Sequence, residues 1–169
     1  MPLHLESIDV QDELAEARSA LIVSCPVCPP VSLAMQRGAP WLEPLRHGVK
    51  TEAFEAHIRD VRDSLERRGI KTGVFRMWIP SPMMCVWTSG QRKRLLKRAA
   101  DYDAVVVLGC DSARVSVERA LAPTDTRVVL AMQLTGLTNA LARFERPMTV
   151  TLTENTLVRD DGSVHDIAA

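Results

Sequence analysis

The apolar run at residues 104–108 (AVVVL) constrains the fold of this chain more than any other segment. Five consecutive apolar residues, most of them β-branched, favour a strand that is buried on both faces, which is typical of parallel sheets. The run stops at Gly109 and Cys110, and Asp111 or Ser112 is expected to cap a helix that runs to about Leu121. The segment therefore predicts one β–α unit of a parallel α/β protein.

Similar units are expected along the rest of the chain. Apolar runs predict further strands at residues 20–24, 72–79, 127–132 and 148–152. Apolar residues at helical spacing predict helices at residues 51–69 and 88–100, with a short helix or lead-in at residues 10–20. Residues 39–50 and 135–139 are expected to be irregular, and Asp161 with Gly162 favours a tight turn in a terminal hairpin.

The alternation of strands and helices predicts an α/β fold. We expect a mainly parallel sheet of four to five strands with helices on both faces, as in flavodoxin-like and Rossmann-like proteins. The length of 169 residues fits one ordinary domain. The expected organisation is an N-terminal helix or lead-in over residues 1–19, an α/β domain over residues 20–147 and a terminal strand or hairpin over residues 148–169.

The chain has no general attraction to polyanions, because its 21 Lys and Arg residues are balanced by 21 Asp and Glu residues. Neither nucleic acid nor an anionic membrane is therefore an expected partner. A cytoplasmic location is expected, because the sequence has no secretory signal pattern and no apolar run that could span a bilayer. One helical segment is locally basic, and we interpret it as a solvated face, with a docking patch for an acidic partner as the alternative. Its cations are Arg92, Lys93, Arg94, Lys97 and Arg98.

The cysteines follow the ends of three predicted strands. Cys25 and Cys28 come after the first strand, Cys85 after the second and Cys110 after the strand at residues 104–108. Because the carboxyl ends of parallel strands lie along one edge of a sheet, where such folds bind ligands, the four sulfurs are expected to converge. Thiolates bind iron–sulfur clusters and zinc strongly, and cytoplasmic cysteines are seldom held in structural disulfides. The sequence therefore predicts one iron–sulfur centre, with zinc as the alternative, held by Cys25, Cys28, Cys85 and Cys110.

Two other interpretations of the cysteines are open. Cysteine is also a common small buried hydrophobe, and Cys110 beside its apolar strand fits that role. The pair Cys25 and Cys28 has the spacing of a dithiol redox site like that of thioredoxin-like proteins. Pro29 and Pro30 are expected to oppose the helix that such a site needs directly after its cysteines, and they predict a rigid loop instead.

The segment from Arg94 to Cys110, with YDAV leading into the apolar strand and Gly109, resembles a known family. It is similar to the small zinc- or cluster-binding subunit associated with bacterial methylenetetrahydrofolate reductases of the acetogen type. The layout also resembles the delta subunit of methyl-viologen-reducing hydrogenase, an iron–sulfur relay. The resemblance covers about residues 20–140. Because no cysteine follows Cys110, it implies one centre at most, together with a larger partner subunit that performs the main chemistry.

Together these features predict an accessory or electron-transfer subunit that holds one cysteine-ligated iron–sulfur centre for a larger oxidoreductase subunit. The resemblance suggests one-carbon folate metabolism as the pathway. A zinc-binding scaffold subunit and a thiol–disulfide oxidoreductase that uses Cys25 and Cys28 are the alternatives. No catalytic residue is assigned, because the sequence lacks the P-loop, G-x-G-x-x-G, G-x-S-x-G and H-E-x-x-H motifs.

Overall fold

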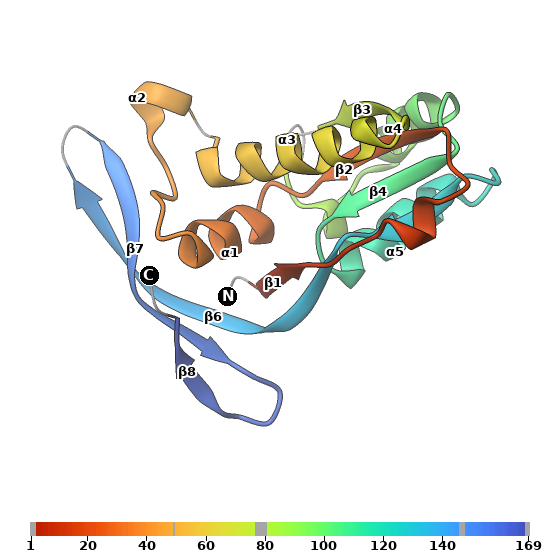
Figure 1. The fold of residues 1–169 in the computed structure, drawn as a ribbon. Helices are drawn as coiled ribbons and strands as arrows, with labels where there is room; N and C mark the ends of the chain where they lie inside the picture. The colour runs from red at the N-terminus through yellow and green to blue at the C-terminus, as the bar shows by residue number, and fades with distance from the viewer. Residues whose placement is uncertain (1–2, 49, 77–80, 146–147, 168–169) are drawn as a thin grey trace. The chain divides into compact units, whose positions relative to one another are not determined.

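The computed structural model describes residues 3–48, 50–76, 81–145 and 148–167 of the chain (Figure 1). The chain folds as two compact units. The first unit comprises Met1–Glu6, Val27–Arg59 and Leu134–Ala169, and the second comprises Ser7–Pro26 and Asp60–Gln133. Within the described ranges, no helix has the length and apolar content that crossing a bilayer requires.

The second unit is built on a parallel sheet with the strand order β3-β2-β4-β5. Its strands are β2 (Ser19–Ser24), β3 (Lys71–Phe75), β4 (Ala104–Leu108) and β5 (Arg127–Leu130). The central strands β2 and β4 are almost entirely buried, whereas β3 and β5 are partly exposed at the edges. This burial explains why the central strands are apolar throughout, as parallel strands covered on both faces require.

Two helices of the second unit pack against each other, α4 (Ser89–Ala99) and α5 (Asp111–Leu121). A capping box begins α4, in which the Thr88 hydroxyl accepts from the Gln91 amide and the Gln91 side chain accepts from the Thr88 amide. Short 3₁₀ helices occur at η1 (Asp12–Leu14) and η2 (Met84–Val86), and η2 packs against α5.

The first unit contains an antiparallel sheet with the order β1-β6-β7-β8. Its strands are β1 (Leu3–Ser7), β6 (Met132–Glu145), β7 (Thr149–Val158) and β8 (Val164–Asp166), with β6 and β7 forming the long blue hairpin of Figure 1. Helix α1 (Cys28–Gln36) packs against β7, and α2 (Pro44–His47) follows it. Helix α3 (Glu52–Arg67) begins in the first unit and ends in the second.

The predicted fold class, a single mainly parallel sheet of the flavodoxin-like or Rossmann-like type, is wrong. The chain forms two separate four-stranded sheets, and one of them is antiparallel. The predicted strand at residues 148–152 is the beginning of β7, which pairs with β6 instead of joining the parallel sheet. Residues 135–139, which were expected to form a loop, lie inside β6.

Local features of the β6–β7 hairpin explain why its sequence does not show a strand pattern. The backbone oxygen of Val158 lies so close to Gly136 that a Cβ there would collide with it, so glycine is required inside the strand. The register shifts between Asn139 and Leu141, and Glu154 has a left-handed φ of 51°. This β-bulge breaks the period-two alternation by which a strand is recognised.

Several local predictions are confirmed. The strand at residues 104–108 has the predicted bounds, and α3 and α4 occupy the predicted helical segments. Helix α5 ends at Leu121 as predicted, but its N-cap residue is Cys110 and not Asp111 or Ser112. The turn with Gly162 joins β7 to β8. The strand predicted at residues 72–79 ends at Phe75, and residues 77–79 of that prediction lie outside the described residues.

Replacing Leu21 by alanine tests the buried centre of the parallel sheet. Leu21 is 0% exposed in β2, so Leu21→Ala should lower the free energy of unfolding by about 2–5 kcal/mol. Leu45→Ala is the matched control, because Leu45 is 68% exposed in α2 and its loss should cost less than about 0.5 kcal/mol. Urea unfolding of both variants measures the difference, and equal costs would contradict the buried position of β2.

Candidate functional site

The carboxyl edge of the parallel sheet has a topological switch point between β2 and β4. The chain leaves β2 toward β3 on one side and leaves β4 toward β5 on the other side, so the two connections run in opposite directions. In open parallel sheets, ligands bind in the crevice that such a reversal leaves beyond the strand ends. The residues that follow β2 and β4, which include Cys25 and Cys110, are therefore the first candidates for a functional site.

Cys25 lies next to the end of β4. Its backbone N–H donates to the carbonyl oxygen of Leu108 over 2.9 Å, which extends the β2–β4 ladder by one step. A Cβ placed on Gly109 would lie 3.4 Å from the Cβ of Cys25 and 2.9 Å from that of Ala113. Because residue 109 is glycine, the backbone after β4 can lie close to both Cys25 and Ala113, which is in the first turn of α5.

Cys110 occupies the N-cap position of α5 and is partly buried, whereas Cys25 is 6% exposed. The backbone of Cys110 is extended, with φ −87° and ψ 176°, which is the usual conformation of an N-cap residue. Two thiols thus follow neighbouring strands, as the sequence predicts, although their side chains differ in burial.

Cys28 begins α1 and carries Pro29 and Pro30 directly behind it in the first turn. The prediction that these prolines make a rigid loop without a helix is wrong. The first turn of a helix has no carbonyl partner for its N–H groups, so proline costs little there and its fixed φ suits the helix. The Ser32 hydroxyl oxygen lies 3.2 Å from the carbonyl oxygen of Cys28, inside the same helix.

Helix α1 is attached to strand β1 of the same unit by side-chain hydrogen bonds. The Ser32 hydroxyl accepts from the Leu5 amide over 3.0 Å and donates to the Leu3 carbonyl oxygen over 2.9 Å. The Gln36 amide group donates to the Leu5 carbonyl oxygen over 2.9 Å. These bonds satisfy backbone groups on the edge of β1 and fix the helix on which Cys28 lies.

Cys85 is exposed on η2. Its neighbours in the sequence anchor that segment, since Met84 is 1% and Trp87 8% exposed. The Trp87 ring also packs edge-to-face against Phe75, with 6.3 Å between the ring centroids. The burial of Met84 and Trp87 holds η2 in place while the thiol of Cys85 faces solvent.

The four cysteines are present as thiols. Across the part of the chain that the structure describes, no group of three or more His, Cys, Asp or Glu side chains is placed to hold a metal ion. A tetrahedral zinc site or a cluster needs three or four such ligands around one point, so the side chains as they lie do not fit either group. The iron–sulfur and zinc assignments of Cys25, Cys28, Cys85 and Cys110 stay predictions.

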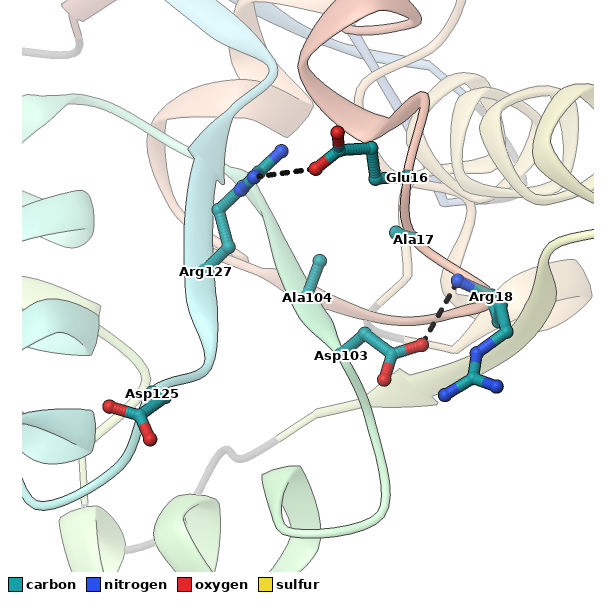
Figure 2. A pocket seen from close by; sticks show the side chains of 7 residues that line it. All are labelled: Glu16, Ala17, Arg18, Asp103, Ala104, Asp125 and Arg127. Atoms are coloured by element: carbon teal, nitrogen blue, oxygen red, sulfur yellow. Dashed lines mark hydrogen bonds and ion pairs between the residues drawn. The ribbon is translucent and has the colours of Figure 1, made fainter.

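The opposite edge of the parallel sheet has a hollow of about 230 Å³ (Figure 2). Its lining residues are Glu16, Ala17, Arg18, Asp103, Ala104, Asp125 and Arg127. Arg127 donates to the Glu13 carbonyl oxygen over 2.6 Å and lies 3.7 Å from the Glu16 carboxylate. One oxygen of Asp103 accepts from the amides of Arg18 and Ser19 and from the Ser19 hydroxyl, over 2.9–3.0 Å.

These contacts give the hollow a structural role. The Asp103 amide donates in return to the Ser19 oxygen over 3.0 Å, so the pair joins the beginning of β2 to the beginning of β4. The hydrogen bonds from the Ser19 hydroxyl and the Arg18 amide lower the pKa of Asp103. The sequence carries no signal for this pairing, because the two residues are far apart in the chain and each is an ordinary polar residue before a strand.

Comparison of the chain with models of protein families, with curated proteins and with solved structures finds no match. The resemblance to the small reductase-associated subunit and to the hydrogenase delta subunit therefore stays a prediction.

Replacing Asp103 by asparagine tests the pairing of the strand beginnings. Because the folded state lowers the pKa of Asp103, its ionised form stabilises the fold above the unfolded pKa of about 4, and this contribution is lost as pH falls through the lower folded value. The difference in melting temperature between the unmodified protein and Asp103→Asn should therefore be largest near neutral pH and shrink below about pH 4.

Asp125→Asn is the matched control, because Asp125 lines the same hollow and, within the described ranges, has no hydrogen bond or ion pair. Its melting temperature should follow that of the unmodified protein at every pH. A difference for Asp103→Asn that persists unchanged in acid would contradict the role given to the carboxylate.

Proposed function

We propose that this chain is a thiol–disulfide redox protein in which Cys25 and Cys28 alternate between two thiols and one disulfide. The observation that supports it most is that α1 begins at Cys28, with only Cys25, Pro26 and Val27 between it and the end of β2 at Ser24. Strand, CxxC and helix then follow one another without interruption, which is the arrangement that activates a thiol in dithiol redox sites.

The placement of the two sulfurs suggests their roles. Cys28 is partly buried in the first turn of α1, where the partial positive charge of a helix N-terminus stabilises a thiolate. Cys25 is buried and is the less accessible sulfur. We therefore assign attack on the substrate to Cys28 and resolution to Cys25.

The reaction balances with a disulfide-bonded partner as the oxidant. The Cys28 thiolate attacks one sulfur of the partner disulfide, which gives a mixed disulfide and releases the other partner sulfur as a thiolate. The Cys25 thiol then loses its proton and attacks Cys28, which releases the second partner sulfur. The products are a Cys25–Cys28 disulfide and a partner dithiol, with two electrons transferred to the partner.

The two residues between the cysteines and the helix that follows them reduce the conformational freedom that is lost when the Cys25–Cys28 disulfide forms. Only Pro26 and Val27 separate the two cysteines, so their sulfurs stay within reach of each other through the covalent chain. Proline in the spacer limits the conformations that must be given up when the disulfide forms. The hydrogen bonds of Ser32 and Gln36 to β1 keep α1 in place during the cycle.

A second candidate function is the accessory subunit with one iron–sulfur centre, or with zinc on the same ligands, for a larger oxidoreductase subunit in the cytoplasm. The observation in its favour is the position of Cys110. This further thiol directly follows Gly109, which lies close to Cys25. A dithiol cycle does not need it. This candidate requires the segment around η2 to move when metal binds, because Cys85 has to leave its exposed position.

Oxidation of the purified protein with oxidised glutathione tests the dithiol cycle. The intact mass should fall by that of two hydrogen atoms, and peptide mapping should find Cys25 joined to Cys28. The reduction potential should lie between about −270 and −120 mV, the range of known dithiol oxidoreductases. Cys28→Ser should abolish reduction of a model disulfide, and Cys25→Ser should accumulate a mixed disulfide on Cys28.

Cys85→Ser is the control for this experiment, because Cys85 is exposed on η2 and takes no part in the proposed cycle. It should retain full activity. A disulfide that joins Cys25 to Cys110 instead, or a Cys28→Ser variant that keeps its activity, would overturn the assignment.

Metal analysis of protein purified without oxygen tests the second candidate. An iron–sulfur centre should give visible absorbance, iron and sulfide in comparable amounts and an EPR signal on reduction. Both Cys85→Ser and Cys110→Ser should then lose the iron. Zinc in one equivalent without visible absorbance would favour the scaffold subunit, and metal-free protein with complete dithiol activity would exclude both centres.

A further inference from the structure

A second hollow, of about 480 Å³, lies on the second unit beside the edge strand β3 and helix α4. Its lining residues are Phe75, Arg94, Lys97, Arg98 and Asp101. The volume is within the range of about 300–1,000 Å³ that is typical of small-molecule sites. Three cations, one acid and one aromatic ring therefore face a space that can hold a small anion with an apolar part.

The cations of this hollow come from one face of α4. Lys97 and Arg98 follow Arg94 by three and four positions, so both lie next to Arg94 on the surface of the helix. The sequence of α4 has no acidic residue. Positive charge is therefore concentrated at this face, although the whole chain has a net charge of zero.

Arg94 and Lys97 differ in their partners from Arg114 of the neighbouring helix α5. Arg114 of α5 has acidic partners on its own helix, Asp111 and Glu118, at 3.4 and 2.8 Å. Throughout the described residues, Arg94 and Lys97 have no carboxylate within 4.0 Å. Charge at the hollow is thus not neutralised by the protein, as a site for an anion requires.

Arg98 is oriented by an aromatic contact. Its guanidinium carbon lies 5.5 Å from the centre of the Tyr102 ring, which is cation–π geometry. The Tyr102 hydroxyl lies where a side chain on residue 73 would be. Glycine at residue 73 therefore makes room for the Tyr102 ring. Arg98 is in this way positioned before any ligand binds, which lowers the entropy lost on binding.

We propose that this hollow binds a nucleoside phosphate, with the phosphate groups on Arg94, Lys97 and Arg98 and the base against the ring of Phe75. Arginine matches phosphate oxygens in a two-pronged geometry, and lysine adds a mobile point charge. Phe75 is partly exposed and is held edge-to-face by Trp87, so its ring offers a fixed apolar surface.

The size and the charge of the hollow favour a small ligand over a macromolecule. A single acid, Asp101, lies at the hollow and limits the negative charge that the site tolerates. Nucleic acid and acidic peptides need an extended positive surface, whereas the cations of this hollow lie on one helix and the chain has a net charge of zero. This inference is independent of the proposed thiol chemistry, because none of the cysteines lines the hollow.

Isothermal titration of the complete protein with ADP tests the proposal. ADP should bind with one-to-one stoichiometry and more weakly as salt is added. Arg94→Glu should weaken binding by about tenfold or more, because a charge-assisted hydrogen bond is replaced by repulsion. Phe75→Ala should weaken the binding of ADP while leaving that of inorganic phosphate unchanged.

Lys93→Glu is the matched control, because Lys93 is exposed on the same helix and carries the same charge but does not line the hollow. It should leave the affinity for ADP nearly unchanged. Failure of ADP to bind at millimolar concentration would overturn the proposal, and so would equal losses for Lys93→Glu and Arg94→Glu. Tighter binding of polyglutamate or single-stranded DNA that depends on Arg94 would overturn it in favour of a macromolecular partner.

Discussion

The parallel pairing of β2 with β4 is the interaction on which the second unit depends. Both strands are buried almost throughout, so every backbone N–H and C=O between them has to find its partner in the ladder. The pairing is closed at both ends by specific contacts. Asp103 and Ser19 join the strand beginnings, and the Cys25 amide bonds to the Leu108 carbonyl oxygen at the strand ends.

The same pairing explains why chemistry concentrates at one edge. At the amino edge most of the interactions are between polar groups of the fold itself, since Asp103 accepts three hydrogen bonds and Arg127 contacts Glu16. At the carboxyl edge the chain turns away through Cys25 after β2 and through Gly109 and Cys110 after β4. Small and reactive side chains are found where the strands have ended and a helix has not yet begun.

The sequence predicts the fold where local pattern and tertiary environment agree. Residues 104–121 have the predicted strand and helix, because a fully apolar strand, a glycine and a capping position all favour the same β–α unit. The antiparallel hairpin could not be predicted in this way. Gly136 is required by the approach of Val158, a residue distant in the sequence, and the bulge at Glu154 removes the alternation that would reveal a strand.

The candidate site shows the same limit, because a strand end fixes where a residue lies but not where its side chain points. Cys25 continues the ladder of β2 and is buried, Cys110 caps α5, and Cys85 lies on a 3₁₀ turn ten residues beyond the end of β3. The sequence pattern predicts that these three cysteines lie at the same edge of the parallel sheet, but each of them has a different environment. Cys28 begins a helix of the first unit and is partly buried, whereas Cys25 belongs to the second unit and is buried, so the two sulfurs differ in exposure. Such inequality suits an attacking and a resolving thiol. Four metal ligands would instead have to converge on one point, and among the described residues no group of three or more His, Cys, Asp or Glu side chains does so.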